Sequence, residues 1–120
     1  MFDGKTVLIT GGTGSLGTAL TQRLLADNVK QIRIFSRNEL KQIEMESKFH
    51  DERLRFLVGD IRELPRLIRA TEDVDYVFHA AALKHVPKIE YNPFEAIKTN
   101  VNGSQNAIDA CLQNNVEKAI

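Results

Sequence analysis

The sequence predicts an α/β fold in which helices cover both faces of a parallel sheet. Short apolar runs alternate with amphipathic stretches along all 120 residues, the pattern of repeated βαβ units. The first run, Thr6–Thr10, is almost continuously apolar or β-branched, as expected of a strand buried on both faces. Four of the chain's seven glycines follow it directly, between Gly11 and Gly17. These observations favour a doubly wound sheet with a glycine-rich turn after its first strand.

Strands and helices are expected to alternate along the whole chain. The expected strands are Thr6–Thr10, Gln31–Phe35, Leu54–Val58, Asp75–His79 and Val116–Ile120. The expected helices begin near Ser15, Glu39, Arg62 and Phe94, and the last runs to about Asn114. Apolar residues at helical spacing give each helix one apolar face: Leu16, Leu20 and Leu24; Leu40 and Ile43; Leu64, Leu67 and Ile68; Phe94, Ile97, Val101, Ile108 and Leu112. Four crossovers of one hand would produce a Rossmann-like sheet with strand order 3-2-1-4-5.

Composition narrows the class of protein. Lys and Arg number 16, as do Asp and Glu, so no net basic field attracts nucleic acid or anionic lipid. The apolar runs are too short to span a membrane, and Met1–Lys5 lacks the apolar stretch of a signal peptide. The single cysteine, Cys111, cannot form an internal disulfide. A cytoplasmic location is therefore expected.

The glycine turn is the strongest functional pattern. Gly12-x-Gly14-x-x-Gly17 fits the dinucleotide fingerprint, and Gly11-x-x-Gly14-x-x-Gly17 fits its variant spacing. Gly11 can adopt a turn conformation that a Cβ would penalise, Gly14 would let phosphate oxygens approach the main chain, and Gly17 would let the helix pack closely on the sheet. The alternative is a glycine-rich turn without a ligand. Its place between an apolar strand and an amphipathic helix favours nucleotide binding.

The end of the second strand indicates which nicotinamide cofactor is preferred. A site selective for NAD usually has Asp or Glu there, whereas this chain reads Phe35-Ser36-Arg37-Asn38. Arg37 could form a bidentate pair with a 2′-phosphate, with further bonds from Ser36 and Asn38 and added charge from Lys41. The alternative is a solvated arginine at a helix start. The pattern favours NADP over NAD.

Other candidate residues follow the third and fourth strands. Asp60 could accept a hydrogen bond from the adenine amine, cap the next helix, or do both. Ala80 and the alanines after it leave room for a ribose and nicotinamide, whereas His79 is interpreted as structural. Lys84 could contact the cofactor and an anionic substrate, or could lie in a solvated loop. Cys111 is expected to be a small core residue and not a nucleophile.

Several segments together resemble the extended short-chain dehydrogenase/reductase family, and within it the UDP-N-acetylglucosamine 4,6-dehydratases of bacterial surface-glycan and flagellin-glycan synthesis. The resemblance covers the whole chain, and the second and third segments are more specific to these dehydratases than the first. The segments are Leu8 to Ser15, Phe35 to Gln42, His79 to Pro87, and Tyr91-Asn92-Pro93 followed by Ile97 to Val101.

The resemblance implies a set of roles in binding NADP and a UDP-sugar. Residues Thr13 to Leu16 would surround the pyrophosphate, residues Ser36 to Lys41 the 2′-phosphate, and Asp60 and Ile61 the adenine, while Ala80 would line the cofactor. Lys84 would touch both the cofactor and the sugar nucleotide. The implied cofactor-binding set is Gly11, Thr13, Gly14, Ser15, Leu16, Gly17, Ser36, Arg37, Asn38, Glu39, Lys41, Asp60, Ile61, Ala80 and Lys84, with no metal ligand.

The family's reaction moves hydride from the sugar C4 to NADP+, eliminates water across C5–C6 and returns hydride at C6. Its catalytic Tyr-x-x-x-Lys pair, and the Asp-Lys of its dehydratase chemistry, lie beyond the fifth strand. Residues 1–120 are therefore expected to be an N-terminal, NADP-binding Rossmann portion that ends in the fifth strand, without a substrate domain or turnover of its own. Two alternatives are a nucleotide-sugar 4-epimerase fragment and a non-catalytic NADP-binding regulatory module. The long fourth helix is expected to support a homo-oligomer.

Overall fold

The computed structural model describes residues 2–80, 106–114 and 116–119, and it confirms the expected topology. All strand pairs are parallel, and the five-stranded sheet has the order β3-β2-β1-β4-β5. The strands are β1 (Thr6–Thr10), β2 (Gln31–Ser36), β3 (Leu54–Val58), β4 (Tyr76–His79) and β5 (Lys118–Ala119). The helices are α1 (Ser15–Leu25), α2 (Glu39–Phe49) and α3 (Leu64–Ala70), and residues 106–113 are also helical.

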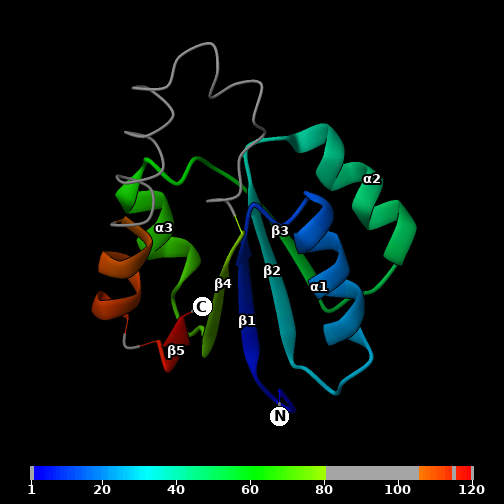
Figure 1. The fold of residues 1–120 in the computed structure, drawn as a ribbon, viewed down its shortest axis with the longest axis horizontal. Helices are drawn as coiled ribbons and strands as arrows, with labels where there is room; N and C mark the ends of the chain where they lie inside the picture. The colour runs from blue at the N-terminus through cyan, green and yellow to red at the C-terminus, as the bar shows by residue number, and fades with distance from the viewer. Residues whose placement is uncertain (1, 81–105, 115, 120) are drawn as a thin grey trace.

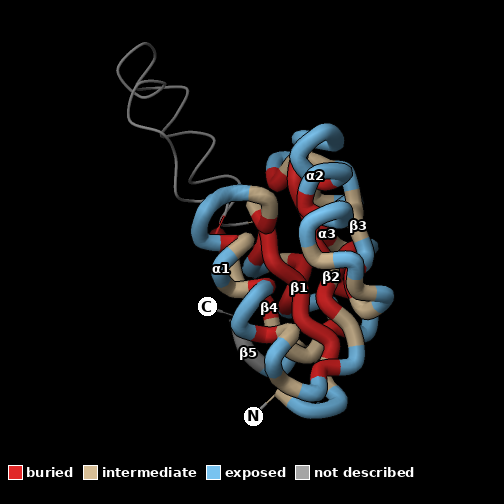
Figure 2. The backbone as a smooth tube through the Cα atoms, turned by 90° about the vertical axis from the view of Figure 1, so that its right-hand side faces the viewer, coloured by how far each residue is buried: buried red, intermediate tan, exposed pale blue. Residues whose placement is uncertain are grey.

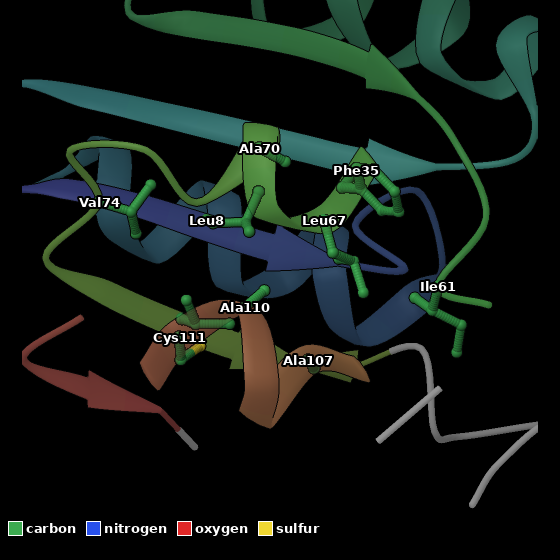
Figure 3. Packing of buried hydrophobic residues seen from close by; sticks show 10 residues of the cluster. Leu8, Phe35, Ile61, Leu67, Ala70, Val74, Ala107, Ala110 and Cys111 are labelled. Atoms are coloured by element: carbon green, nitrogen blue, oxygen red, sulfur yellow. The ribbon is translucent and has the colours of Figure 1, made fainter. Parts of the chain in front are cut away.

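The helices form two layers, one on each face of the sheet (Figure 1). Alternate residues of β1 point to opposite layers. Val7 and Ile9 pack in a cluster with Leu24 of α1 and Met45 of α2. Leu8 packs in the other cluster with residues of α3 and of the helix at 106–113 (Figure 3). That second cluster contains Leu8, Phe35, Ile61, Leu67, Ala70, Val74, Val77, Ala107, Ala110 and Cys111.

The central position of β1 explains its apolar sequence. All five of its residues are buried, and the tube of β1 is red along its length in Figure 2. A strand with neighbours on both sides and helices on both faces has no solvated surface, so a nearly continuous apolar run is what the position requires. The sequence-based interpretation of Thr6–Thr10 is therefore confirmed.

The face of α2 that packs on the sheet differs from the expectation. Leu40 and Ile43 were expected to face inward, yet they are 66% and 56% exposed. Gln42 and Met45 are buried in their place. Met45 and Phe49, four residues apart, pack in the cluster with Val7 and Ile9, and on the same face the Gln42 amide donates a 3.0 Å hydrogen bond to the carbonyl of Leu57 in β3.

Two other apolar stripes are only partly buried. In α1, Leu24 is buried, whereas Leu16 in the first turn is 46% exposed. In the helix at 106–113, the small residue Ala110 lies against the core, and Ile108 and Leu112 are exposed. Within the described part of the chain, no helix combines the length and apolar character needed to cross a bilayer.

Candidate cofactor-binding site

The carboxyl ends of the first three strands meet at one edge of the sheet. Because the strands are parallel, the segments that follow them emerge on the same side. The Gly11 amide donates a 2.7 Å hydrogen bond to the Phe35 carbonyl of β2. The Gly59 amide donates a 2.9 Å bond to the Ser36 carbonyl. These bonds hold the glycine turn, the end of β2 and the segment after β3 in fixed relation.

Three of the four glycines in the turn are required by the protein's own packing. Gly11 has a φ of +66°, which residues with a Cβ rarely adopt. A Cβ on Gly12 would lie 2.7 Å from Cγ2 of Ile34. A Cβ on Gly17 would lie 2.4 Å from Cα of Gly12, so α1 packs closely on the turn itself, where the sequence suggested close packing on the sheet.

Gly14 is different, because neither its backbone nor its neighbours require a glycine. Its φ is −75°, and an added Cβ would have only the Gly11 carbonyl oxygen near it, at 3.5 Å. Gly14 is the N-cap of α1, has no side chain with which to cap the helix, and is followed by a first turn without acidic residues. The first amides of a helix lack intrahelical partners and carry a partial positive charge. This helix start is therefore suited to an anion that approaches the main chain closely.

Arg37 and Asp60 lie across the same edge, at the ends of β2 and β3. Arg37 is half-exposed, and its Nη1 lies 3.8 Å from Oδ2 of Asp60. Arg62 binds the same carboxylate more closely, with its Nη2 at 2.8 Å from Oδ2. Two guanidinium groups therefore share one carboxylate, and a second carboxylate lies beside them, because Oε1 of Glu63 accepts a 3.3 Å bond from the Asp60 amide.

Asp60 does not cap α3, so that part of the expectation was wrong. Its Oδ1 accepts a 2.8 Å hydrogen bond from the Arg62 amide, and the N-cap of α3 is Glu63, so the helix begins at Leu64 and not near Arg62. The hydrogen bond from the Arg62 side chain holds the pKa of Asp60 below its usual range. Ile61, expected beside adenine, packs in the core cluster with Leu8.

The turn into α2 contains the other residues expected at a 2′-phosphate. Asn38 is the N-cap of α2, and its Oδ1 accepts a 3.0 Å bond from the Lys41 amide. The Asn38 side-chain NH2 group is then the part that could donate to an anion. Glu39 and Lys41 are exposed at the same helix start.

Sequence reasoning missed Gln42, a buried polar residue one turn into α2. Its Nε2 donates to Oγ of Ser36 at 2.9 Å and to the Leu57 carbonyl at 3.0 Å. A glutamine in an amphipathic helix usually lies on the solvated face, so no local pattern in the sequence indicates that Gln42 is buried. Only its contacts with the ends of two strands do.

The remaining candidates lie around β4 or outside the described residues. Oγ1 of Thr10 and Nδ1 of His79 are 2.6 Å apart, which joins the ends of β1 and β4 as a structural histidine would. Ala80 is buried in the cluster beneath α1 and α2. Cys111 is a core residue, and burial raises the pKa of its thiol. Lys84 lies within residues 81–105, outside the described ranges.

A parallel sheet in this order, with a glycine turn between its first strand and helix, defines the Rossmann-like class of α/β proteins. Comparison with family models gives a more specific assignment. The model described as "Polysaccharide biosynthesis protein" matches residues 7–120. The chain belongs to this family of polysaccharide biosynthesis proteins.

Curated relatives include two kinds of nucleotide-sugar enzyme. The chain is 57% identical over 122 residues to a UDP-N-acetylglucosamine 4,6-dehydratase (inverting) of Campylobacter jejuni, covering 100% of this chain and 36% of that protein. It is 49% identical over 124 residues to a UDP-glucose 4-epimerase of Rickettsia prowazekii, again covering 100% of this chain and 36% of the relative. The chain thus spans 36% of the length of these relatives, and its resemblance to the dehydratases is confirmed.

Solved structures share the fold closely. Pen from Bacillus thuringiensis superimposes with a TM-score of 0.93 at 46% identity, covering 99% of this chain and 37% of that one. DesIV, a dTDP-glucose 4,6-dehydratase from Streptomyces venezuelae solved with NAD and TYD bound, gives a TM-score of 0.82 at 27% identity. That alignment covers 95% of this chain and 38% of DesIV.

Proposed function

We propose that this chain is the cofactor-binding portion of an NADP-dependent nucleotide-sugar 4,6-dehydratase that acts on UDP-N-acetylglucosamine in surface-glycan synthesis. The 57% identity to a dehydratase of that specificity supports the substrate, and the NAD bound to DesIV supports a nicotinamide cofactor. When bound, the cofactor would accept hydride from the sugar and later return it. The residues of this chain would bind and orient the cofactor for that exchange.

The observation that carries the proposal is the start of α1 at Gly14. The fold itself explains three of the glycines. Gly11 has a positive φ, and Gly12 and Gly17 have no room for a Cβ. Gly14 has no such explanation, and it is the N-cap, directly before the first amides of α1. Close approach of a diphosphate to the amides of Ser15 and Leu16 explains why a glycine is needed at this position.

The preference for NADP is supported by charge at the end of β2. No carboxylate stands in the segment Ser36 to Asn38 to accept bonds from ribose hydroxyls. Asp60 is already shared by Arg37 and Arg62. Arg37 is the looser partner at 3.8 Å, so it can turn to a 2′-phosphate while Arg62 keeps Asp60 charged and in place.

A second candidate is a nucleotide-sugar 4-epimerase, favoured by the 49% identity to the Rickettsia protein. The two activities differ in their products, because a dehydratase removes water from the sugar and an epimerase does not. Mass spectrometry of the full-length protein's product from UDP-N-acetylglucosamine separates them. Loss of one water supports the dehydratase, and a product of unchanged mass contradicts it.

Cofactor binding is tested by calorimetric titration of the full-length protein with NADP+ and NAD+, in the wild type and in Gly14→Ala. We expect Gly14→Ala to weaken both cofactors by about tenfold or more, because the new methyl group blocks the diphosphate. Its free energy of unfolding should change by less than about 1 kcal/mol, since the backbone angles of Gly14 suit alanine. Wild-type affinity in a folded Gly14→Ala protein would place the diphosphate elsewhere.

A further inference from the structure

Gln42 is a buried polar side chain at the edge where the cofactor is proposed to bind. It is 4% exposed and lies between the end of β2 and the end of β3. Its Nε2 lies 2.9 Å from Oγ of Ser36, 3.0 Å from the Leu57 carbonyl oxygen and 3.5 Å from the Ser36 carbonyl oxygen. One amide nitrogen thus serves three acceptors from two strands.

The two carbonyls determine which end of the amide faces the strands. A carbonyl oxygen can only accept a hydrogen bond, so the group facing Leu57 has to be the NH2 group and not the side-chain oxygen. It follows that the Ser36 hydroxyl accepts from Gln42 at 2.9 Å. A hydroxyl has one proton to donate, and this contact leaves that proton unused. Among the described residues, no acceptor for it is found.

We propose that Gln42 is a positioning residue for cofactor selectivity, which acts by turning the Ser36 hydroxyl into a hydrogen-bond donor for the 2′-phosphate of NADP. This inference rests on the proposed function. Without the amide, the Leu57 carbonyl would lose the donor that now satisfies it, and the Ser36 hydroxyl would no longer be held as an acceptor. With the amide in place, the inward acceptor is occupied and the proton is available to an anion beside Arg37.

The test measures NADP+ and NAD+ affinities of the full-length protein in four forms: wild type, Ser36→Ala, Gln42→Met and the double variant. We expect Ser36→Ala to weaken NADP+ by about tenfold and NAD+ by less than about twofold, as for loss of one charge-assisted bond. Gln42→Met, which has a similar shape but no donor, should reduce the preference for NADP+ in the same direction. The double variant should be no less selective than Ser36→Ala alone, because both changes remove one interaction.

Met45→Ala is the matched control. It should lower the stability of the same helix from a buried position, and it leaves the hydrogen bond between Gln42 and Ser36 in place. An unchanged cofactor preference in Met45→Ala, with a reduced one in Gln42→Met, supports positioning. Equal shifts in the two variants, or full additivity of Ser36→Ala and Gln42→Met, would show a general structural effect and overturn the inference.

Two further measurements cover a Gln42→Met protein that does not fold. Gln42→Glu offers the Ser36 proton a carboxylate, so it should lose NADP+ affinity at least as strongly as Ser36→Ala. In cofactor-free protein, the Gln42 side-chain NH2 resonances should exchange slowly with solvent and shift in Ser36→Ala. If the wild type has no preference for NADP+, the proposed cofactor is wrong as well. If it prefers NADP+ and Gln42→Glu keeps that preference, only the role of Gln42 is wrong.

Discussion

Gly17 in the first turn of α1 lies against the backbone of Gly12, and a Cβ on Gly17 would come within 2.4 Å of Gly12 Cα. Backbone atoms cannot rotate aside as a side chain can. We therefore expect Gly17→Ala to displace α1 from the turn and to lower the free energy of unfolding by about 3 kcal/mol or more. Urea denaturation followed by circular dichroism measures this. Gly14→Ala is the matched control, and equal stability of the two variants would contradict the packing described here.

Arg37→Ala tests the proposed contact with the 2′-phosphate. Removal of one charge-assisted interaction should weaken NADP+ binding by about 1.5–3 kcal/mol and leave NAD+ binding nearly unchanged. Titration calorimetry with both cofactors provides the comparison. Arg69→Ala serves as the charge-matched control, because Arg69 is an exposed arginine in the last turn of α3. Equal losses for NADP+ and NAD+ would show that Arg37 does not distinguish the cofactors.

The Asp60–Arg62 pair should make stability depend on pH in a defined direction. The pKa of Asp60 is lowered chiefly by the hydrogen bond from Arg62, so the ionised form stabilises the native state. That contribution is complete above the unfolded-state pKa of about 3.9 and is lost as pH falls through the lower folded-state value.

Arg62→Ala should therefore raise the pKa of Asp60 and destabilise the protein more at neutral pH than in acid. Carboxyl NMR titration gives the pKa, and denaturation at two pH values gives the stability. Arg37→Ala should raise the same pKa by less, because Arg37 is the more distant partner at 3.8 Å. A larger effect of Arg37→Ala would reverse the assignment of the two arginines.

The orientation of α2 predicts unequal costs for three alanine substitutions. Met45→Ala removes a buried side chain and should cost about 2–4 kcal/mol of stability. Leu40→Ala and Ile43→Ala remove exposed side chains and should each change stability by about 0.5 kcal/mol or less. Thermal denaturation compares them. A large cost for Leu40→Ala would mean that the other face of α2 meets the sheet.

Exposed apolar residues on the helix at 106–113 are expected to promote self-association. Leu112 is 72% exposed and Ile108, one turn before it, is 51% exposed. Leu112→Lys should shift the full-length protein toward a smaller oligomer in light scattering, since it places a charge at the contact. Leu112→Met is the apolar control. An unchanged molar mass in Leu112→Lys would exclude this face from the interface.

Local patterns in the sequence were sufficient for the elements and their order. The apolar run at Thr6–Thr10 and the glycines after it predict a strand, a turn and a helix, because β-branched residues favour strands and glycine permits the turn whatever the rest of the chain does. The bounds of α2 also follow from Asn38, a residue type that favours N-caps, and a helical pattern to Phe49. Connections of one hand then leave few strand orders, and the order β3-β2-β1-β4-β5 is one of them.

Tertiary contacts decided two further features. They determined which face of each helix meets the sheet and which partner each polar group at the strand ends binds. Leu40 has the chemistry of a core residue and Gln42 that of a surface residue, yet Leu40 is exposed and Gln42 is buried with bonds to two strands. Asp60 is of a residue type that often caps helices, but its carboxylate binds the guanidinium of Arg62 instead. Hydrophobic spacing specifies that a helix has an apolar side, whereas packing and hydrogen bonds with the other elements decide which side is buried.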